Sequence, residues 1–166
     1  MMTKVATDRS EIIILTSDNP KSENPFNILN DMLSALGWTV QDYIRCCGED
    51  FFLSLPNGHK LFVHDSRRLA VWAAITMAEE DDVVVVAGRG HETYQLLGNK
   101  RTYIDDKEEC REALRYLKKL HLADQGEHKY MMAVQESMMS FFRRATVFQT
   151  PNASDKNNSN LMQHAK

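Results

Sequence analysis

Two short runs of β-branched residues constrain this chain most, because a polar, turn-forming loop follows each at once. Residues 12–16 read Ile-Ile-Ile-Leu-Thr, and residues 81–87 end in four valines and an alanine. Continuous apolar runs of this length are typical of strands buried on both faces, as in parallel sheets. No apolar run approaches the roughly 20 residues needed to cross a bilayer. We therefore expect two interior strands of one parallel sheet.

Helical patterns alternate with these runs. Asn24 can cap a helix that has Pro25 in its first position and ends at Gly37. An N-cap at Asp65 opens a helix to about residue 80, and a capping box is expected at Asp106. The remaining elements are a short helix in 38–47, a strand at 61–63, a hairpin of 93–97 with 101–104, and a helix after 106. This order predicts an α/β fold, an open and mostly parallel sheet with helices on both faces.

Composition excludes several classes of function. A chain of 166 residues makes one ordinary domain, and its net charge of −3 argues against electrostatic binding to nucleic acid. Its three cysteines have no metal spacing, so we expect free thiols and no metal site. The chain shows no targeting segment. Residues 126–149 could form an appended amphipathic helix, and 150–166 a polar disordered tail.

The two loops that follow the strong runs carry the chemistry. Asp18, Asn19 and Lys21 place a carboxylate, an amide and a cation within four residues, around the rigid Pro20. The other loop reads Gly88-Arg89-Gly90-His91-Glu92, in which the glycines allow close backbone approach. Ligands bind outside the carboxyl ends of parallel strands, so neighbouring strands would bring these loops together. Glu92 and Asp18 would then hold an ammonium, and Lys21 and Asn19 a carboxylate, as an amino acid requires.

Other patterns weaken competing hypotheses. The Gly-x-Gly of residues 88–90 lacks the third glycine of a dinucleotide fingerprint. No G-x-x-x-x-G-K-[ST] phosphate-binding loop occurs. We interpret His64, Asp65, Arg67 and Arg68 as a helix cap and a solvated basic face.

Three segments resemble one protein family. Residues 15–25 resemble the DNPR segment of Mur ligases of the MurE type, 85–95 resemble their AGKGHE-x-YQ segment, and 105–108 resemble their DDRE segment. Residues 38–60 and 64–71 are similar to the plant plastid members. The resemblance covers roughly residues 4–122.

The resemblance implies both a fold and an activity. Family members join an amino acid to a UDP-linked muramoyl dipeptide, using ATP and Mg²⁺ to activate the carboxylate. Their carboxyl-terminal domain is Rossmann-like and holds the amino acid, diaminopimelate in the DNPR class. By resemblance, the amino-acid pocket comprises Asp18, Asn19, Lys21, Gly88 and Glu92, supported by Pro20, Gly90 and His91. No catalytic residue is identified.

The chain also departs from the family pattern. Lys21 replaces the arginine of DNPR, which predicts weaker or altered amino-acid selectivity. The UDP-binding domain, the ATPase domain and the first strand of the carboxyl-terminal domain have no counterpart. Residues 1–125 are therefore expected to be a partial carboxyl-terminal domain that binds no ATP and is inactive alone.

Two functional hypotheses remain open. The first is the amino-acid-binding part of an ATP-dependent acid–amino acid ligase for peptidoglycan precursors. The second is a non-catalytic interaction module of the plastid RNA polymerase complex in chloroplast development, which the plant resemblance implies. A full-length plant protein would lie in the plastid stroma, and a protein of other origin in the cytoplasm. Neither hypothesis involves direct nucleic-acid or membrane binding.

Overall fold

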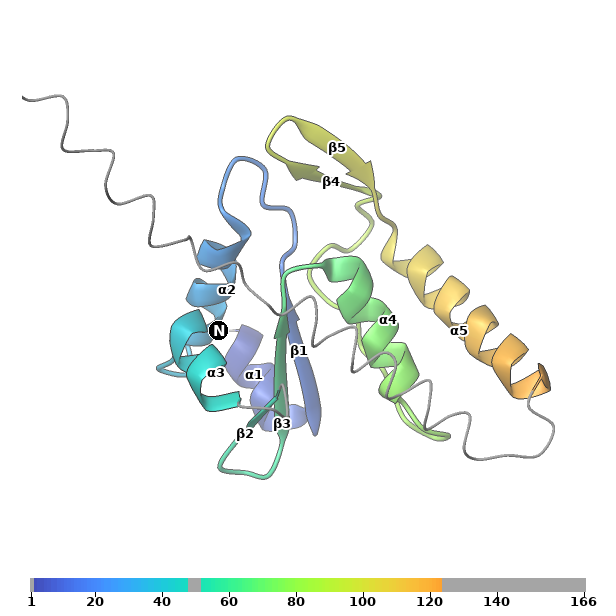
Figure 1. Cartoon of the computed structure of the whole chain (residues 1–166), viewed down its shortest axis with the longest axis horizontal. Helices are drawn as coiled ribbons and strands as arrows, with labels where there is room; N and C mark the ends of the chain where they lie inside the picture. The colour runs from blue at the N-terminus through green and yellow to red at the C-terminus, as the bar shows by residue number, and fades with distance from the viewer. Residues whose placement is uncertain (1, 48–51, 124–166) are drawn as a thin grey trace, which may run out of the picture.

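Two strands that lie far apart in the sequence form the centre of the fold. β1 (Ile12–Thr16) pairs in parallel with β3 (Lys60–His64), with Ile12 opposite Lys60 and Thr16 opposite His64. β2 (Leu53–Ser54) pairs antiparallel with the other edge of β3, so the sheet order is β1-β3-β2. β4 (Tyr94–Leu97) and β5 (Lys100–Tyr103) form a separate antiparallel hairpin (Figure 1). The expected strand at 61–63 and the expected hairpin are confirmed.

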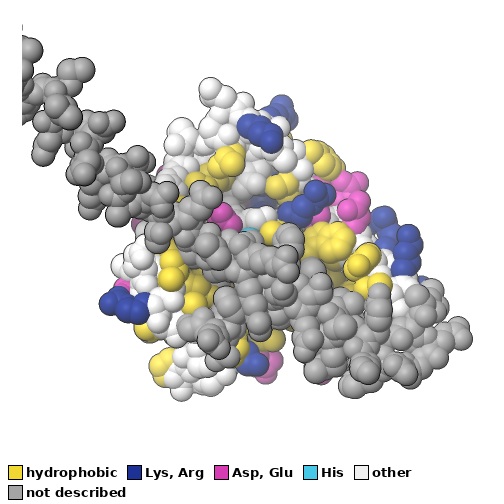
Figure 2. Space-filling model, viewed as in Figure 1, with side chains coloured by type: hydrophobic (Ala, Val, Ile, Leu, Met, Phe, Trp, Pro, Cys, Tyr) yellow, Lys and Arg dark blue, Asp and Glu magenta, His cyan; other side chains and the backbone are white. Residues whose placement is uncertain are grey.

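The computed structural model describes residues 2–47 and 52–123. The helix expected in 126–149 and the tail expected in 150–166 lie outside this range. The helices are α1 (Met2–Arg9), α2 (Pro25–Ser34), α3 (Val40–Cys47), α4 (Arg67–Met77) and α5 (Asp106–Ala123). Among the described residues, none of these helices is both long and apolar enough to cross a membrane. On the face in Figure 2, Lys and Arg side chains are scattered among acidic and apolar ones.

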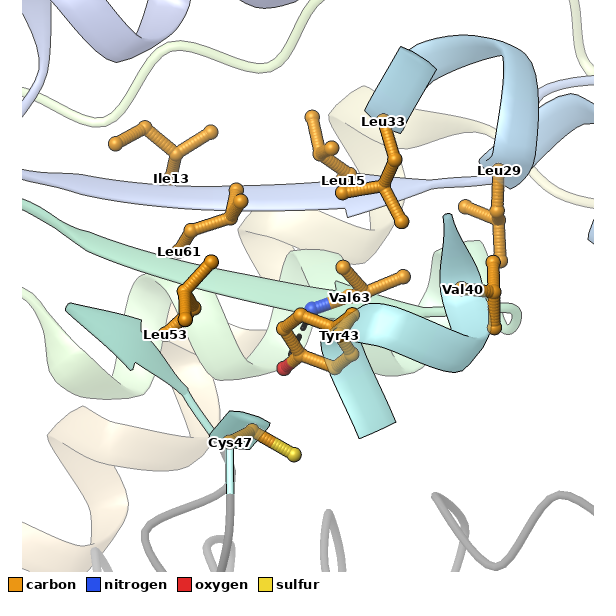
Figure 3. Close-up of a cluster of buried hydrophobic side chains, with 10 residues drawn as sticks. All are labelled: Ile13, Leu15, Leu29, Leu33, Val40, Tyr43, Cys47, Leu53, Leu61 and Val63. Carbon is orange, nitrogen blue, oxygen red and sulfur yellow. Dashed lines mark hydrogen bonds between the residues drawn. The ribbon is translucent and has the colours of Figure 1, made fainter. Parts of the chain in front are cut away.

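Helices cover both faces of the small sheet (Figure 1). α2 and α3 lie on one face, where Leu29 and Leu33 are fully buried against β1 and β3 (Figure 3). The Asn24 side chain accepts a hydrogen bond from Phe26 N–H at 3.0 Å, which confirms the expected cap of α2. The hydroxyl of the buried Tyr43 accepts from Val63 N–H at 3.1 Å and so ties α3 to β3 (Figure 3). Burial raises the pKa of Tyr43, because the phenolate would lose its hydration there.

α4 and α5 pack together on the other side, through polar as well as apolar contacts. The buried Glu109 carboxylate accepts from Arg68 Nε at 2.8 Å and from Trp72 Nε1 at 2.8 Å. The capping box expected at Asp106 is therefore wrong, because Glu109 faces α4 and does not turn back to the helix start. Asp105 caps α5 instead, since its Oδ1 accepts from the N–H groups of Lys107 and Glu108. The N-cap of α4 is Ser66, one residue after the expected Asp65.

The sequence predicts a second buried strand at residues 81–87, and this prediction is wrong for this chain. These residues belong to no strand, and the Val83 and Val85 side chains are 86 % and 80 % exposed. A strand exists only where a neighbouring strand completes its hydrogen-bond ladder, and β1 is separated from this segment by a groove. β1 itself is confirmed, but it is buried on one face only, through Ile13 and Leu15. The structure is therefore mixed α/β without an extended parallel sheet in the described residues.

We predict that His64 makes stability depend on pH. Its imidazole is 2 % exposed, its Nδ1 accepts from Ser66 N–H at 2.9 Å, and burial lowers its pKa below the usual 6.5. The unfolded chain then binds a proton more readily than the folded one, so the free energy of unfolding should fall as pH drops through about 6.5. Urea unfolding between pH 7.5 and 5.5 measures this slope. His64→Asn should flatten it, whereas His91→Asn, a change of an exposed histidine, should leave it unchanged. Equal slopes in wild type and His64→Asn would contradict the prediction.

Candidate functional site

The loop after β1 is anchored at the carboxyl end of the sheet. Ser17 is buried, and its hydroxyl donates to the Asp65 carbonyl at 2.6 Å, which joins the ends of β1 and β3. Pro20 is buried and turns the chain away from the strand. Lys21 follows with φ at 55°, in the left-handed region that few non-glycine residues adopt. Its side chain is exposed, so the cation faces solvent beside the loop.

The β4–β5 hairpin holds this loop in place. Lys21 N–H donates to the Leu96 carbonyl at 2.8 Å, and Leu96 N–H donates to Asn19 Oδ1 at 2.8 Å. Gln95 Nε2 donates to the Asp18 carbonyl at 2.7 Å, and Gly98 N–H donates to the Lys21 carbonyl at 2.5 Å. Because Asn19 Oδ1 accepts from the backbone, its Nδ2 group points the other way and is free to donate toward the second loop.

The second loop is fixed by a buried cation. Arg89 is 4 % exposed, and its guanidinium donates to the carbonyls of Tyr94 at 2.5 Å, Asp18 at 3.4 Å and Ile104 at 3.4 Å. Gly88 and Gly90 on either side have φ of 116° and 61°, which explains why glycine is required at both positions. One side chain therefore ties the loop after residue 87 to the loop after β1 and to both ends of the hairpin.

A second buried cation holds the start of this loop. Arg67 is 3 % exposed and pairs with both carboxylate oxygens of Asp106, at 2.8 Å and 2.6 Å. The same guanidinium donates to the Ala87 carbonyl at 3.0 Å. The expectation of a solvated basic face is thus wrong for Arg67, and it is also wrong for the buried His64. A planar guanidinium can bind a carboxylate and a carbonyl together, and this explains why arginine is suited to this interior position.

The two loops converge, as the sequence led us to expect. Asn19 Nδ2 donates to Glu92 Oε2 at 3.4 Å, although the two residues are 73 positions apart. Asp18 Oδ1 is buried and has no hydrogen-bond partner among the residues that the structure describes. The hairpin and Arg89 produce this convergence, whereas we had expected it from two adjacent strands. His91 is exposed at the rim.

The arrangement offers groups for a small zwitterion. The Asp18 and Glu92 carboxylates can accept from an ammonium, and Asn19 Nδ2 with the Lys21 ammonium can donate to a carboxylate. Gly88 packs against the Arg67 guanidinium, since a Cβ at this position would lie 3.8 Å from Arg67 Nη1. Within residues 2–47 and 52–123, no group of three or more His, Cys, Asp or Glu side chains is placed to hold a metal ion.

Comparisons with known proteins identify the family. No family model matches the chain. Over 137 residues, 82 % of the chain, it is 52 % identical to the chloroplastic "UDP-N-acetylmuramoyl-L-alanyl-D-glutamate--2,6-diaminopimelate ligase MurE homolog" of Arabidopsis thaliana. The homolog of Zea mays is 49 % identical over the same length, and the ligase of Clostridium tetani is 38 % identical over 117 residues.

The chain belongs to the MurE-type Mur ligases. A solved ligase structure with the same description matches 70 % of the chain at a TM-score of 0.54 and 35 % identity. This chain spans only 18 % of the two plant relatives and 20 % of the solved structure's chain. The similarity to MurE-type proteins therefore concerns one part of a much longer protein.

Sequence reasoning missed the two buried arginines that hold these loops. The sequence pattern predicts a solvated basic face for Arg67 and no structural role for Arg89. The carboxylate partner of Arg67, Asp106, is 39 positions away in the sequence. The partners of Arg89 are backbone carbonyls, which no pattern of side chains reveals. The one available signal is that Arg89 lies between two glycines, which leave room for a large side chain to turn inward.

We predict that Arg89→Met loosens both loops. It leaves several carbonyls without a donor, and each buried carbonyl without a donor costs about 1–3 kcal/mol. The free energy of unfolding should fall by about 2–4 kcal/mol, and amide exchange at Lys21 and Leu96 should speed up. Arg111→Met, at an exposed site on α5, should change stability by less than about 0.5 kcal/mol. If Arg89→Met lowered the free energy of unfolding no more than Arg111→Met does, Arg89 would not hold the two loops together.

Proposed function

We propose that this chain forms the amino-acid-binding, carboxyl-terminal part of an acid–amino acid ligase of the MurE type, with diaminopimelate as its amino acid. The observation that supports the proposal is the hydrogen bond from Asn19 to Glu92, which brings together two loops that also carry Asp18 and Lys21. The relatives' names supply the substrate class. The same proposal places the parallel pair of β1 and β3 within a Rossmann-like sheet of a longer polypeptide.

The role proposed for each residue follows from the hydrogen bonds that its side chain can donate or accept. The buried Asp18 Oδ1 gains a donor when an ammonium binds beside it, and Glu92 supplies a second acceptor. Asn19 cannot reverse its amide without losing the bond from Leu96 N–H, so it presents Nδ2 to the ligand carboxylate. Lys21 adds a positive charge that attracts the ligand carboxylate. The substrate's remaining amine would be left free to attack the activated carboxylate of the partner substrate.

The chain's own residues do not fit ATP and Mg²⁺. The sequence has no G-x-x-x-x-G-K-[ST] loop to surround phosphates, and the acidic groups in the described residues do not cluster around one point. We therefore assign no step of ATP chemistry to this chain. Its proposed contribution is to bind and orient the amino acid.

We predict that Glu92→Gln weakens binding of meso-diaminopimelate. Loss of a charge-assisted hydrogen bond to an ammonium costs about 1.5–3 kcal/mol, or roughly 10- to 100-fold in Kd. Isothermal titration of the 166-residue chain measures this effect. Glu23→Gln, the same change at an exposed position near the first loop, is the control and should leave Kd unchanged.

Two results of this titration would contradict the proposal. One is equal affinity of wild type and Glu92→Gln. The other is no binding by a chain whose circular dichroism shows that it is folded. The second result would favour the alternative role as an interaction module of the plastid RNA polymerase complex. The chloroplastic relatives support a plastid location for either role, and we propose the stroma.

We predict that Lys21→Arg binds diaminopimelate more tightly than wild type. Arginine can donate two parallel hydrogen bonds to a carboxylate, whereas lysine offers one compact charge. The gain should be about 1 kcal/mol, or roughly fivefold in Kd. Lys4→Arg on α1 is the matched control. Equal affinities of wild type and Lys21→Arg would show that Lys21 does not contact the substrate carboxylate.

A further inference from the structure

A hollow of about 280 Å³ lies where α4 meets α5. One residue of α4 and four of α5 line it: Trp72, Glu112, Arg115, Tyr116 and Lys119. The Trp72 and Tyr116 rings contact each other there, with 5.8 Å between their centroids, yet Tyr116 remains 49 % exposed. Large aromatic side chains contribute most when apolar surface covers them. This α4–α5 hollow therefore offers ring surface that a further apolar element can cover.

The face of α5 beside this hollow changes the sign of its charge along the helix. Glu108 and Glu112 lie in the first half of α5, and Arg115 and Lys119 lie in the second half. Residues three or four positions apart share one face of a helix, so these four side chains form one stripe. All four are exposed. A neighbouring helix complements this stripe when it runs antiparallel to α5, with its own acidic residues first and its basic residues last.

The sequence that follows α5 has this pattern. Its apolar residues recur at the spacing of one helical face: Tyr130, Val134, Met138 and Phe141. Glu127 comes before them, and Arg143 and Arg144 come after them. These residues lie outside the described part of the chain, and their pattern predicts an amphipathic helix with its acidic end first.

The length of this sequence suits an antiparallel return. α5 ends at Ala123 in the described residues, and Tyr116 lies about 10 Å back along the helix axis. Residues 124–129 provide a connection of the length that is common between neighbouring helices. A helix of residues 130–141 would be about 18 Å long, enough to reach from Lys119 back to Glu108. Its start would then lie beside the basic half of α5, and its end beside the acidic half.

We propose that residues 130–141 form a helix that packs antiparallel to α5 and covers the α4–α5 hollow. In this arrangement Val134 contacts the Tyr116 ring, and Glu127 lies beside Lys119. A segment joined to α5 by a short connection has a large advantage over a separate partner, because its binding is intramolecular. The inference is independent of amino-acid binding, since no residue of the two candidate loops lines the hollow.

The test is nuclear magnetic resonance on the full 166-residue chain. Nuclear Overhauser effects should join the Val134 methyl protons to the Tyr116 ring protons, and amides of residues 130–141 should exchange slowly. Met138→Asp places a charge on the apolar face and should speed exchange of these amides at least tenfold. Met132→Asp, the same change on the opposite side of the helix, should leave the exchange rates unchanged. Amides of β3 should stay protected in both variants, which shows that the rest of the fold is intact.

Three results would overturn the proposal. The first is a wild-type chain in which β3 is protected but Val134 shows no contact with Tyr116. The second is equal exchange rates of residues 130–141 in Met138→Asp and Met132→Asp. The third comes from a mixture of ¹³C-labelled and unlabelled chains: contacts between Val134 and Tyr116 that join different chains only would place the segment of a second copy in the hollow.

Discussion

The arrangement of the two candidate loops depends on the hydrogen bonds that the buried Arg89 guanidinium donates. This guanidinium lies between the loop after β1 and the β4–β5 hairpin, and it donates to carbonyls of both. A buried cation is costly unless several acceptors surround it, so the carbonyls of Asp18, Tyr94 and Ile104 must stay close to it. That requirement brings Asn19 within reach of Glu92. Arg89 and Asp18 are 71 positions apart in the chain. The two loops thus meet because a single side chain needs acceptors from both.

The rest of the fold holds in position the elements that carry the two loops. The apolar core between β1, β3, α2 and α3 fixes the loop after β1 at the end of the sheet. The Arg67–Asp106 pair joins α4 to α5 and holds Ala87 at the start of the second loop. The hydrogen bond from Arg67 to Ala87 matters because no neighbouring strand in the described residues pairs with residues 82–87 to position them. Arg67 therefore holds the second loop at the end of a segment that the sheet itself does not hold.

Local chemistry explains which elements could be predicted from the sequence. The cap at Asn24 and the hairpin around Gly98 each depend on residues close together in the chain, and the structure confirms them. The prediction of a strand at residues 81–87 failed because a strand also needs a neighbouring strand, and no local sequence pattern reveals whether one is present. Arg67 and Glu109 were misread for a similar reason, since their partners lie 39 and 41 positions away. The two candidate loops could be singled out because their polar residues follow apolar runs directly, whereas the arginines that hold them give no such local signal.

Chemical-shift mapping tests most directly whether the two loops form one amino-acid site. In an ¹⁵N-labelled chain titrated with meso-diaminopimelate, we predict shifts for the amides of residues 18, 19, 21 and 22 together with those of residues 88–92, at one common Kd. Amides of α3, on the far side of the core, should not move. Shifts confined to one loop, or two loops that respond with different Kd values, would contradict a shared site.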